Sequence, residues 1–145
     1  MRILVGVDDS KFSDEAVRAI VTEFRPQGAQ VRVLHVLQPI AVSAPPQMSP
    51  HYAPELEDQA KKAEEVVERG AKTLRAAGFK VDTSIEKGDI RLKLIDAAAE
   101  WNADLIVVGS HGRSAIPRLV LGSVAEFVAR NAYCSVEIVR AKPSK

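Results

Sequence analysis

Glycines and hydroxyl residues recur near the end of the chain at a spacing that suits phosphate chemistry. Gly109 and Gly112 are followed, ten residues further on, by Gly122 and Ser123. Glycine has no Cβ and reaches positive φ, so backbone N–H groups beside it can turn toward phosphate oxygens. A helix that begins at Gly122 and Ser123 would add free N–H donors, the positive end of its dipole and a hydroxyl. This stretch therefore predicts an anion site.

The spacing differs from the two common phosphate loops. No Gly-Lys-Ser/Thr follows the glycines, which excludes a P-loop, and the first apolar run leads to Asp8-Asp9-Ser10 rather than to the glycines of a dinucleotide fingerprint. The glycines also have a simpler interpretation as ordinary residues of strand-to-helix turns. A helix start after a buried strand favours the anion site, and Arg113 and Arg118 are cations that could face phosphates.

Other polar side chains give weaker signals. We interpret Asp8 as a ligand-binding residue and Asp9 as a turn residue, since Asp is common in turns before helices. His111 lies inside the glycine stretch, where it either contacts phosphate or is an exposed loop residue. His35 lies inside a predicted strand, so we expect a hydrogen-bonded histidine in the core or at the sheet edge rather than a ligand. Cys134 has no His or Cys beside it in sequence, which predicts a buried structural thiol.

Apolar periodicity predicts the elements that must position these residues. Short aliphatic runs predict five strands, at 2–7, 30–37, 79–86, 104–108 and 135–140. Helical spacing predicts four helices: one capped by Ser13, one over 55–77 ended by Gly78, one from the cap Asp89 to about Trp101 with Leu92, Ile95, Ala98 and Ala99 inward, and one from Gly122 to Asn131.

Strict alternation of strands and helices predicts an α/β fold with a doubly wound parallel sheet. Such sheets bind ligands at the carboxyl ends of their strands. Asp8 follows the first strand and Gly109 the fourth, so both are expected at that edge. The proline-rich segment 38–54 shows no periodicity and is long for a loop, which points to a lid or a disordered segment.

Composition narrows the classes of function. The 145 residues suit one domain, 1–145, and 46% hydrophobic residues can form a core. A net charge of +1 argues against nucleic acid or anionic lipid as partner. A single cysteine, an apolar start too short for a signal peptide and no stretch near the ~18 apolar residues of a membrane span predict a cytoplasmic protein.

Four segments together resemble the universal stress protein family. The pattern Gly109-x2-Gly112-x9-Gly122-Ser123 matches the family's ATP-binding motif, G-x2-G-x9-G-[S/T]. The opening ILVGVDDS resembles the family's first strand with its VDxS turn, and LHV at 34–36 resembles the end of its second strand. The segment DLIVVGSHG at 104–112 resembles its most recognisable stretch. The resemblance covers nearly the whole chain and places it with the ATP-binding members.

The resemblance implies a fold and a site. The fold would be a five-stranded parallel sheet in the order 3-2-1-4-5 with helices on both faces, like the adenine-nucleotide alpha-hydrolases. Asp8 would hold the adenosine, the backbone of Val36 would contact adenine, and the glycines with Ser123 would hold phosphates and ribose. The whole implied cofactor-binding set is Asp8, Val36, Gly109, Ser110, Gly112, Arg113, Gly122, Ser123 and Val124.

The resemblance also implies cofactors and partners. The ligand would be ATP, ADP or AMP. Asp9 stands where glycine is frequent in the family, and its charge would repel a triphosphate unless Mg²⁺ lies between them. A homodimer would form through the last strand, at Val136 and Ile138, and a regulatory partner protein of unknown kind would respond to the bound nucleotide.

Three functions are open at this point. The first is a nucleotide-binding regulatory protein of the stress response. The second is an enzyme, either a slow ATPase or a nucleotidyl- or phosphoryl-transfer protein, for which His111 and Asp9 are the candidate bases. The third is a dimerisation module that binds no nucleotide.

Overall fold

Strands and helices alternate along the chain, as the sequence predicts. The computed structural model describes residues 1–38, 52–111 and 120–141. Its elements are β1 (Arg2–Gly6), α1 (Lys11–Glu23), β2 (Gln30–Leu37), α2 (Tyr52–Ala76), β3 (Lys80–Lys87), α3 (Ile90–Trp101), β4 (Leu105–Gly109), α4 (Ser123–Asn131) and β5 (Ser135–Val139).

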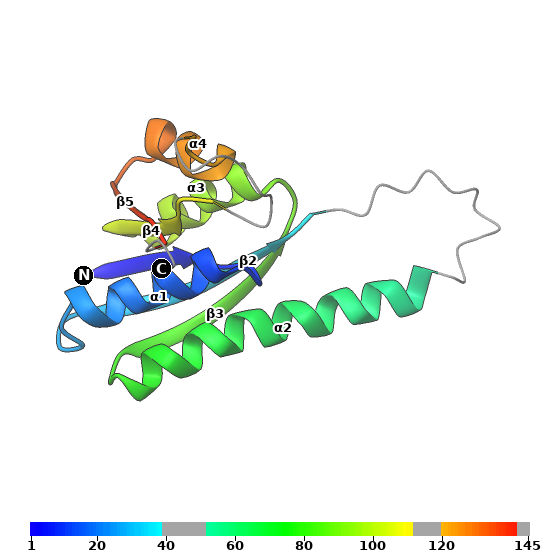
Figure 1. Ribbon diagram of the computed structural model, residues 1–145, viewed down its shortest axis with the longest axis horizontal. Helices are drawn as coiled ribbons and strands as arrows, with labels where there is room; N and C mark the ends of the chain where they lie inside the picture. The colour runs from blue at the N-terminus through cyan, green and yellow to red at the C-terminus, as the bar shows by residue number, and fades with distance from the viewer. Residues whose placement is uncertain (39–51, 112–119, 142–145) are drawn as a thin grey trace.

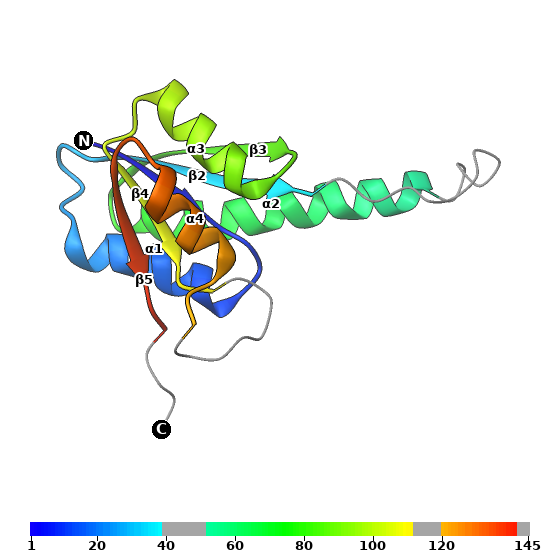
Figure 2. The same cartoon turned by 90° about the horizontal axis from the view of Figure 1, so that it is seen from above.

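The strands form one parallel sheet in the order β3-β2-β1-β4-β5, which confirms the predicted fold class. Helices α1 and α2 cover one face of this sheet, and α3 and α4 cover the other (Figure 1). The view from above looks onto the face of the sheet that α3 and α4 cover (Figure 2). The first part of α2 extends past the end of the sheet (Figure 1).

Each face of the sheet has its own apolar core, because successive side chains of a strand point to opposite faces. The core under α1 and α2 contains the odd-numbered residues of the central strands, among them Ile3, Val5 and Val107. The core under α3 and α4 contains the even-numbered ones, among them Leu4 and Ile106. Strands buried on both faces are typical of parallel α/β sheets.

Two helix starts differ from the prediction. Helix α1 begins at Lys11 and its N-cap is Ser10, whose hydroxyl accepts from the Ser13 N–H at 3.4 Å, so the expected cap at Ser13 was wrong. Helix α2 begins at Tyr52, three residues before the expected start, and so includes Pro54, which the first turn of a helix tolerates. The rest of the expected loop at 38–54 lies outside the described residues, apart from residue 38.

Helix α3 confirms one prediction and corrects another. Asp89 is its N-cap, and its carboxylate accepts from the Arg91 N–H at 2.9 Å. Leu92 and Ala99 were expected to face inward, but both are exposed, Leu92 at 54%, whereas Leu94 is buried at 1%. Among the described residues, no helix combines the length and the apolar character that a bilayer span requires.

A pair of carboxyl groups joins α1 to the edge strand β5. Glu137 lies in the middle of β5, and Glu23 faces it from the last turn of α1. The Oε2 atom of Glu137 is buried and has no hydrogen-bond partner among the described residues. Burial, followed by the hydrogen bond and charge of Glu23, raises the pKa of Glu137 to about 7. The folded chain therefore holds a proton here that the unfolded chain releases near its ordinary pKa of 4.5.

This pair predicts a pH-dependent loss of stability. A raised folded pKa stabilises the fold fully below about pH 4.5, and that contribution is lost as the pH rises through about 7. We expect Glu137→Gln, which stays uncharged, to gain about 1–2 kcal/mol of unfolding free energy over the wild type at pH 8, and much less at pH 5.5. Urea unfolding at both pH values, followed by the fluorescence of Trp101, measures the difference.

Glu86→Gln on the other edge strand is the matched control, since it removes the same charge from a strand far from Glu23. A Glu137→Gln variant whose unfolding free energy parallels the wild type at both pH values would contradict the coupling.

Candidate functional site

The carboxyl ends of β1 and β4 lie next to each other at the centre of the sheet. The two strands pair in register, with Val5 opposite Val107. The chain runs outward from β1 through β2 to β3, and then returns to add β4 and β5 on the other side. The strand order therefore reverses between β1 and β4. Connections leave in opposite directions at such a point, and the crevice that results is where doubly wound sheets bind ligands.

Asp8 lies at this crevice, directly after β1. Its carboxylate Oδ1 accepts from the Ser10 N–H at 2.8 Å and from the Ser13 hydroxyl at 2.9 Å, and its own N–H donates to that hydroxyl at 2.7 Å. Asp8 thus organises the turn into α1. Both carboxylate bonds end at Oδ1, so Oδ2 is the atom through which Asp8 could also meet a ligand. A turn role and the predicted ligand-binding role of Asp8 are therefore compatible.

Val36 borders the crevice through its backbone. The Val7 N–H donates to the Leu34 carbonyl at 2.9 Å, so Leu34 directs its backbone groups toward β1. Alternate residues of a parallel strand bond to the same neighbour, which means that Val36 also points its N–H and carbonyl to that side. Regular pairing of the two strands ends at Leu34. The backbone of Val36 therefore points into the space beyond Val7.

His35 helps to end that pairing. Continued pairing would direct the Val36 N–H to the Val7 carbonyl, but this carbonyl accepts from Nδ1 of the His35 ring at 2.8 Å. A carbonyl only accepts, so Nδ1 carries the proton. His35 is the hydrogen-bonded histidine that the sequence predicts. The carbonyl it binds was not predictable, because the bond depends on where β1 stops.

Gly109 and Gly122 allow neighbouring segments of the backbone to pack closely against each other. A Cβ on Gly109 would lie 2.8 Å from the Cβ and 2.9 Å from the carbonyl oxygen of Phe12, in the first turn of α1. A Cβ on Gly122 would lie 2.7 Å from the carbonyl oxygen of Ser110. The glycine spacing predicts either the approach of phosphate or ordinary strand-to-helix turns at these positions. The structure gives a further cause, which is that α1 and α4 pack directly on the end of β4.

The start of α4 is an open helix N-terminus. Its N-cap Gly122 has no side chain to cap the helix, and its carbonyl accepts the first intrahelical bond, from the Glu126 N–H at 2.9 Å. The N–H groups of Ser123, Val124 and Ala125 precede that bond and have no intrahelical acceptor. These donors, the positive end of the helix dipole and the exposed hydroxyl of Ser123 make a place for an anion.

Ser110 is surrounded by protein groups rather than open to a ligand. The residue is 2% exposed, and its hydroxyl lies 3.1 Å from Nδ1 of His111. Its N–H donates to the Val139 carbonyl, and its carbonyl accepts from the N–H of the α4 N-cap, both at 2.8 Å. Ser110 therefore shapes the crevice from beneath. Gly112 and Arg113 lie outside the described residues.

His111 uses both of its ring nitrogens in contacts with the protein. Nε2 lies 2.5 Å from the Val120 carbonyl, so it must carry a proton. Nδ1 of the neutral ring then accepts from the Ser110 hydroxyl. The ring also packs at a tilt against Phe12, with 5.2 Å between centroids. Neither of the two roles that the sequence suggested, phosphate contact or exposed loop residue, anticipates these bonds.

The remaining candidates give no second site among the described residues. Cys134 is only partly buried, whereas the sequence predicts a buried thiol. Its partial burial still raises the pKa of the thiol, which fits a structural role. No group of three or more His, Cys, Asp or Glu side chains in the described ranges could hold a metal ion.

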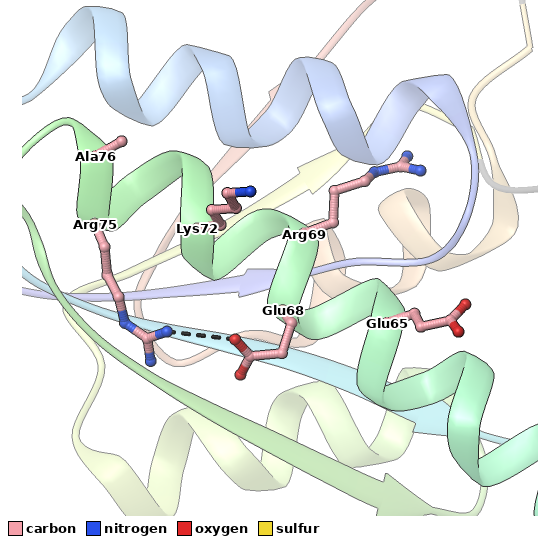
Figure 3. Close-up of a pocket in the computed structure, with 6 residues that line it drawn as sticks. All are labelled: Glu65, Glu68, Arg69, Lys72, Arg75 and Ala76. Carbon is pink, nitrogen blue, oxygen red and sulfur yellow. Dashed lines mark hydrogen bonds and ion pairs between the residues drawn. The ribbon is translucent and has the colours of Figure 1, made fainter.

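A depression on the outer surface of α2 is unrelated to the crevice. All its lining residues belong to this one helix, and in Figure 3 their side chains fan out to both sides of it. Three of them are already engaged in ion pairs, since Glu68 pairs with Arg75 at 3.4 Å and Arg69 binds Asp14 of α1 at 2.6 Å. This is a charged, solvated helix surface, lined by Glu65, Glu68, Arg69, Lys72, Arg75 and Ala76.

Comparison with known proteins supports the resemblance found in the sequence. A universal stress protein from Mycolicibacterium smegmatis is 35% identical over 142 residues, covering 94% of this chain. The chain spans 47% of that relative, or about half its length. Universal stress protein MJ0531 of Methanocaldococcus jannaschii is 30% identical over 145 residues, covering 99% of this chain and 84% of the relative.

Two solved structures have the same fold. The hypothetical protein MJ0577, whose biochemical function was assigned from its structure, superposes with a TM-score of 0.83 at 26% identity, covering 99% of this chain and 97% of its own. A universal stress protein in complex with cAMP superposes with a TM-score of 0.71 at 27% identity, covering 98% of each chain. The model of the universal stress protein family matches residues 1–140, and the chain belongs to that family.

Proposed function

We propose that this chain binds an adenine nucleotide, ATP foremost, in the crevice between the ends of β1 and β4, and acts as a regulatory protein of the stress response. The observation that carries the proposal is the uncapped N-terminus of α4, held against the end of β4 at the switch point of the sheet. The cAMP held by a family member of the same fold supports an adenine nucleotide as the ligand.

The nucleotide would lie across the crevice, with its two ends bound by different chemistry. Oδ2 of Asp8 would accept from a hydroxyl of the adenosine, and the N–H and carbonyl of Val36 would match the donor and acceptor edge of adenine. The first-turn amides of α4 with the Ser123 hydroxyl would bind phosphate. Gly109 and Gly122 would keep the adenosine-binding and phosphate-binding groups at a fixed separation. Ser110 lies beneath this arrangement, and Val124 contributes its backbone N–H.

Two further groups complete the proposed site. Gly112 and Arg113 follow the end of β4 in the chain, and we place them beside the phosphates on the strength of the family motif. Mg²⁺ would accompany a triphosphate as its counterion, which reduces repulsion from the exposed carboxylate of Asp9. ATP, ADP and AMP differ in this respect, because repulsion grows with phosphate charge.

The contacts of His111, one of the two candidate bases, favour binding over turnover. A general base needs a free lone pair within reach of the attacking group. The Nδ1 lone pair of His111 is directed at the Ser110 hydroxyl, and Ser110 itself is too buried to meet a substrate. We therefore place the protein's activity in nucleotide-dependent contacts with a partner protein rather than in catalysis, and we place it in the cytoplasm.

The second part of the proposal is a homodimer through β5. Strand β5 lies at one edge of the sheet. The Val139 carbonyl bonds to β4 through Ser110, so by alternation Val136 and Ile138 point their N–H and carbonyl groups at the open edge. The side chains of Val136 and Ile138 are only partly buried. The opposite edge, β3, carries charged residues, which discourage pairing, at Lys80, Asp82, Glu86 and Lys87.

The phosphate end of the site can be tested by adding a negative charge to it. Ser123→Glu keeps a residue that suits the first turn of a helix but places a carboxylate where the phosphate would bind. We expect ATP affinity to fall at least about tenfold and adenosine affinity to stay within about twofold. Calorimetric titration with ATP, AMP and adenosine, with and without Mg²⁺, measures both.

Ala129→Glu adds the same charge to an exposed position in the last turn of α4, and it should leave ATP affinity unchanged. A wild-type protein that binds no adenine nucleotide would overturn the proposal. Equal ATP affinities in the wild type and Ser123→Glu would remove the α4 N-terminus from the site.

The dimer can be tested by removing one edge hydrogen-bond donor. Val136→Pro deletes an N–H that points away from β4, so the ladder inside the sheet stays intact. We expect this variant to be a monomer at concentrations at which the wild type is a dimer, as measured by sedimentation equilibrium. Thr83→Pro removes the corresponding outward N–H from β3 and should stay dimeric. A monomeric wild type, or a dimer that dissociates only in Thr83→Pro, would refute pairing through β5.

A further inference from the structure

Two hydrogen bonds join the residues that follow β4 to the residues that precede α4. The Gly122 N–H donates to the Ser110 carbonyl at 2.8 Å, and Nε2 of His111 lies 2.5 Å from the Val120 carbonyl. Residues 112–119, outside the described ranges, connect these two flanks. Both bonds join residues 110–111 to residues 120–122. Together they fix the start of α4 relative to the end of β4.

The His111 ring reaches a third element. It packs against the Phe12 ring in the first turn of α1, with an angle of 55° between the ring planes. Phe12 also contacts the end of β4, since its carbonyl oxygen is 2.9 Å from where a Cβ of Gly109 would lie. One side chain therefore contacts α1, the end of β4 and the approach to α4, which are the elements that border the crevice.

The protonation of the ring follows from these partners. The Val120 carbonyl can only accept, so Nε2 holds a proton in the neutral and in the cationic ring alike. Nδ1 accepts from the Ser110 hydroxyl when the ring is neutral and donates to it when the ring is charged. The bond to Val120 therefore persists in both states. His111 has no free nitrogen for chemistry, which indicates a mechanical role.

We propose that His111 is a positioning residue for the phosphate-binding end of the site: its bond to the Val120 carbonyl holds the first-turn amides of α4 at the distance from β4 that a bound nucleotide requires. The inference rests on the proposed function, because it concerns the same site. It goes further in assigning the orientation of the phosphate-binding amides to one side chain that does not contact the nucleotide. The adenosine end, at Asp8 and Val36, does not depend on this bond.

Three variants separate the two bonds of the ring. The amide nitrogen of glutamine stands as many bonds from the backbone as Nε2 of histidine, and that of asparagine as many as Nδ1. His111→Gln can therefore still donate to the Val120 carbonyl, whereas His111→Asn reaches only as far as Ser110. Both lose the ring contact with Phe12, so they form a matched pair. His111→Ala loses all three contacts.

We expect His111→Ala and His111→Asn to bind ATP about tenfold more weakly than the wild type, and His111→Gln to regain most of the loss. Adenosine affinity should be unchanged in all three, as measured by calorimetric titration. The Gly122 amide, which donates to Ser110, should exchange its hydrogen faster in the Ala and Asn variants than in the Gln variant, with no nucleotide present. This exchange rate is measured by NMR.

Each other result overturns the inference. Unchanged ATP affinity in His111→Ala shows that the ring positions nothing that the nucleotide uses. Equal losses for ATP and adenosine show general damage to the fold, and recovery in His111→Asn rather than His111→Gln assigns the effect to Ser110. A wild type that binds no ATP refutes the proposed function and with it the positioning of phosphate. Hydrogen exchange still reports, in that case, whether His111 fixes the start of α4.

Discussion

The pairing of β1 with β4 is the constraint on which the rest of the structure depends. Side chains of both strands are fully buried, including Ile3, Leu4 and Val5 on one and Ile106 and Val107 on the other, all 0% exposed. Burial on both faces requires helices on both sides of the sheet. Parallel pairing requires each connection to run back over one face of the sheet as a crossover. The strand order must then reverse between these two strands, so the crevice lies over the most deeply buried part of the molecule.

The crevice needs a second constraint, which is the close approach of helices to the end of β4. Two positions without a Cβ allow it, since Gly109 meets the backbone of Phe12 and Gly122 meets that of Ser110. The helix termini are thereby brought to the end of the sheet without intervening side chains. Amides at a helix N-terminus act on an anion only over the first turn, so this short separation decides whether α4 can contribute at all.

The sequence predicts the fold well because its signals are local and periodic. Four consecutive aliphatic residues in β4 indicate a strand buried on both faces, and alternation of elements then determines a parallel sheet. Helix ends were harder to place. Ser10 and Ser13 are both suitable caps by residue type, and only the bond of the Ser13 hydroxyl to Asp8 shows why Ser13 lies one turn inside the helix. Leu92 was misplaced because α3 is apolar on more than one side.

The geometry of the candidate site was predictable in part. The spacing of the glycines with Ser123 identified the start of α4, and the position of Asp8 after β1 identified the edge of the sheet. The bonds of His35 and His111 could not be predicted, because each joins a ring to a carbonyl at a place where regular structure stops. No sequence pattern identifies a backbone carbonyl that is free of regular secondary-structure hydrogen bonds. Tertiary packing alone determines which carbonyls these are.

Strand β5 shows how alternation lets one short strand serve two purposes. Its odd-numbered residues bond to β4 and place Glu137 on the α1 face, where its proton is linked to the packing of that helix. Its even-numbered residues, Val136 and Ile138, pack their partly buried side chains against the core under α3 and α4 and place their backbone groups at the open edge. The proton of Glu137 and the proposed pairing through the edge thus involve alternate residues of the same strand. A change at the edge backbone leaves the contact of Glu137 with Glu23 in place, since the two point in different directions.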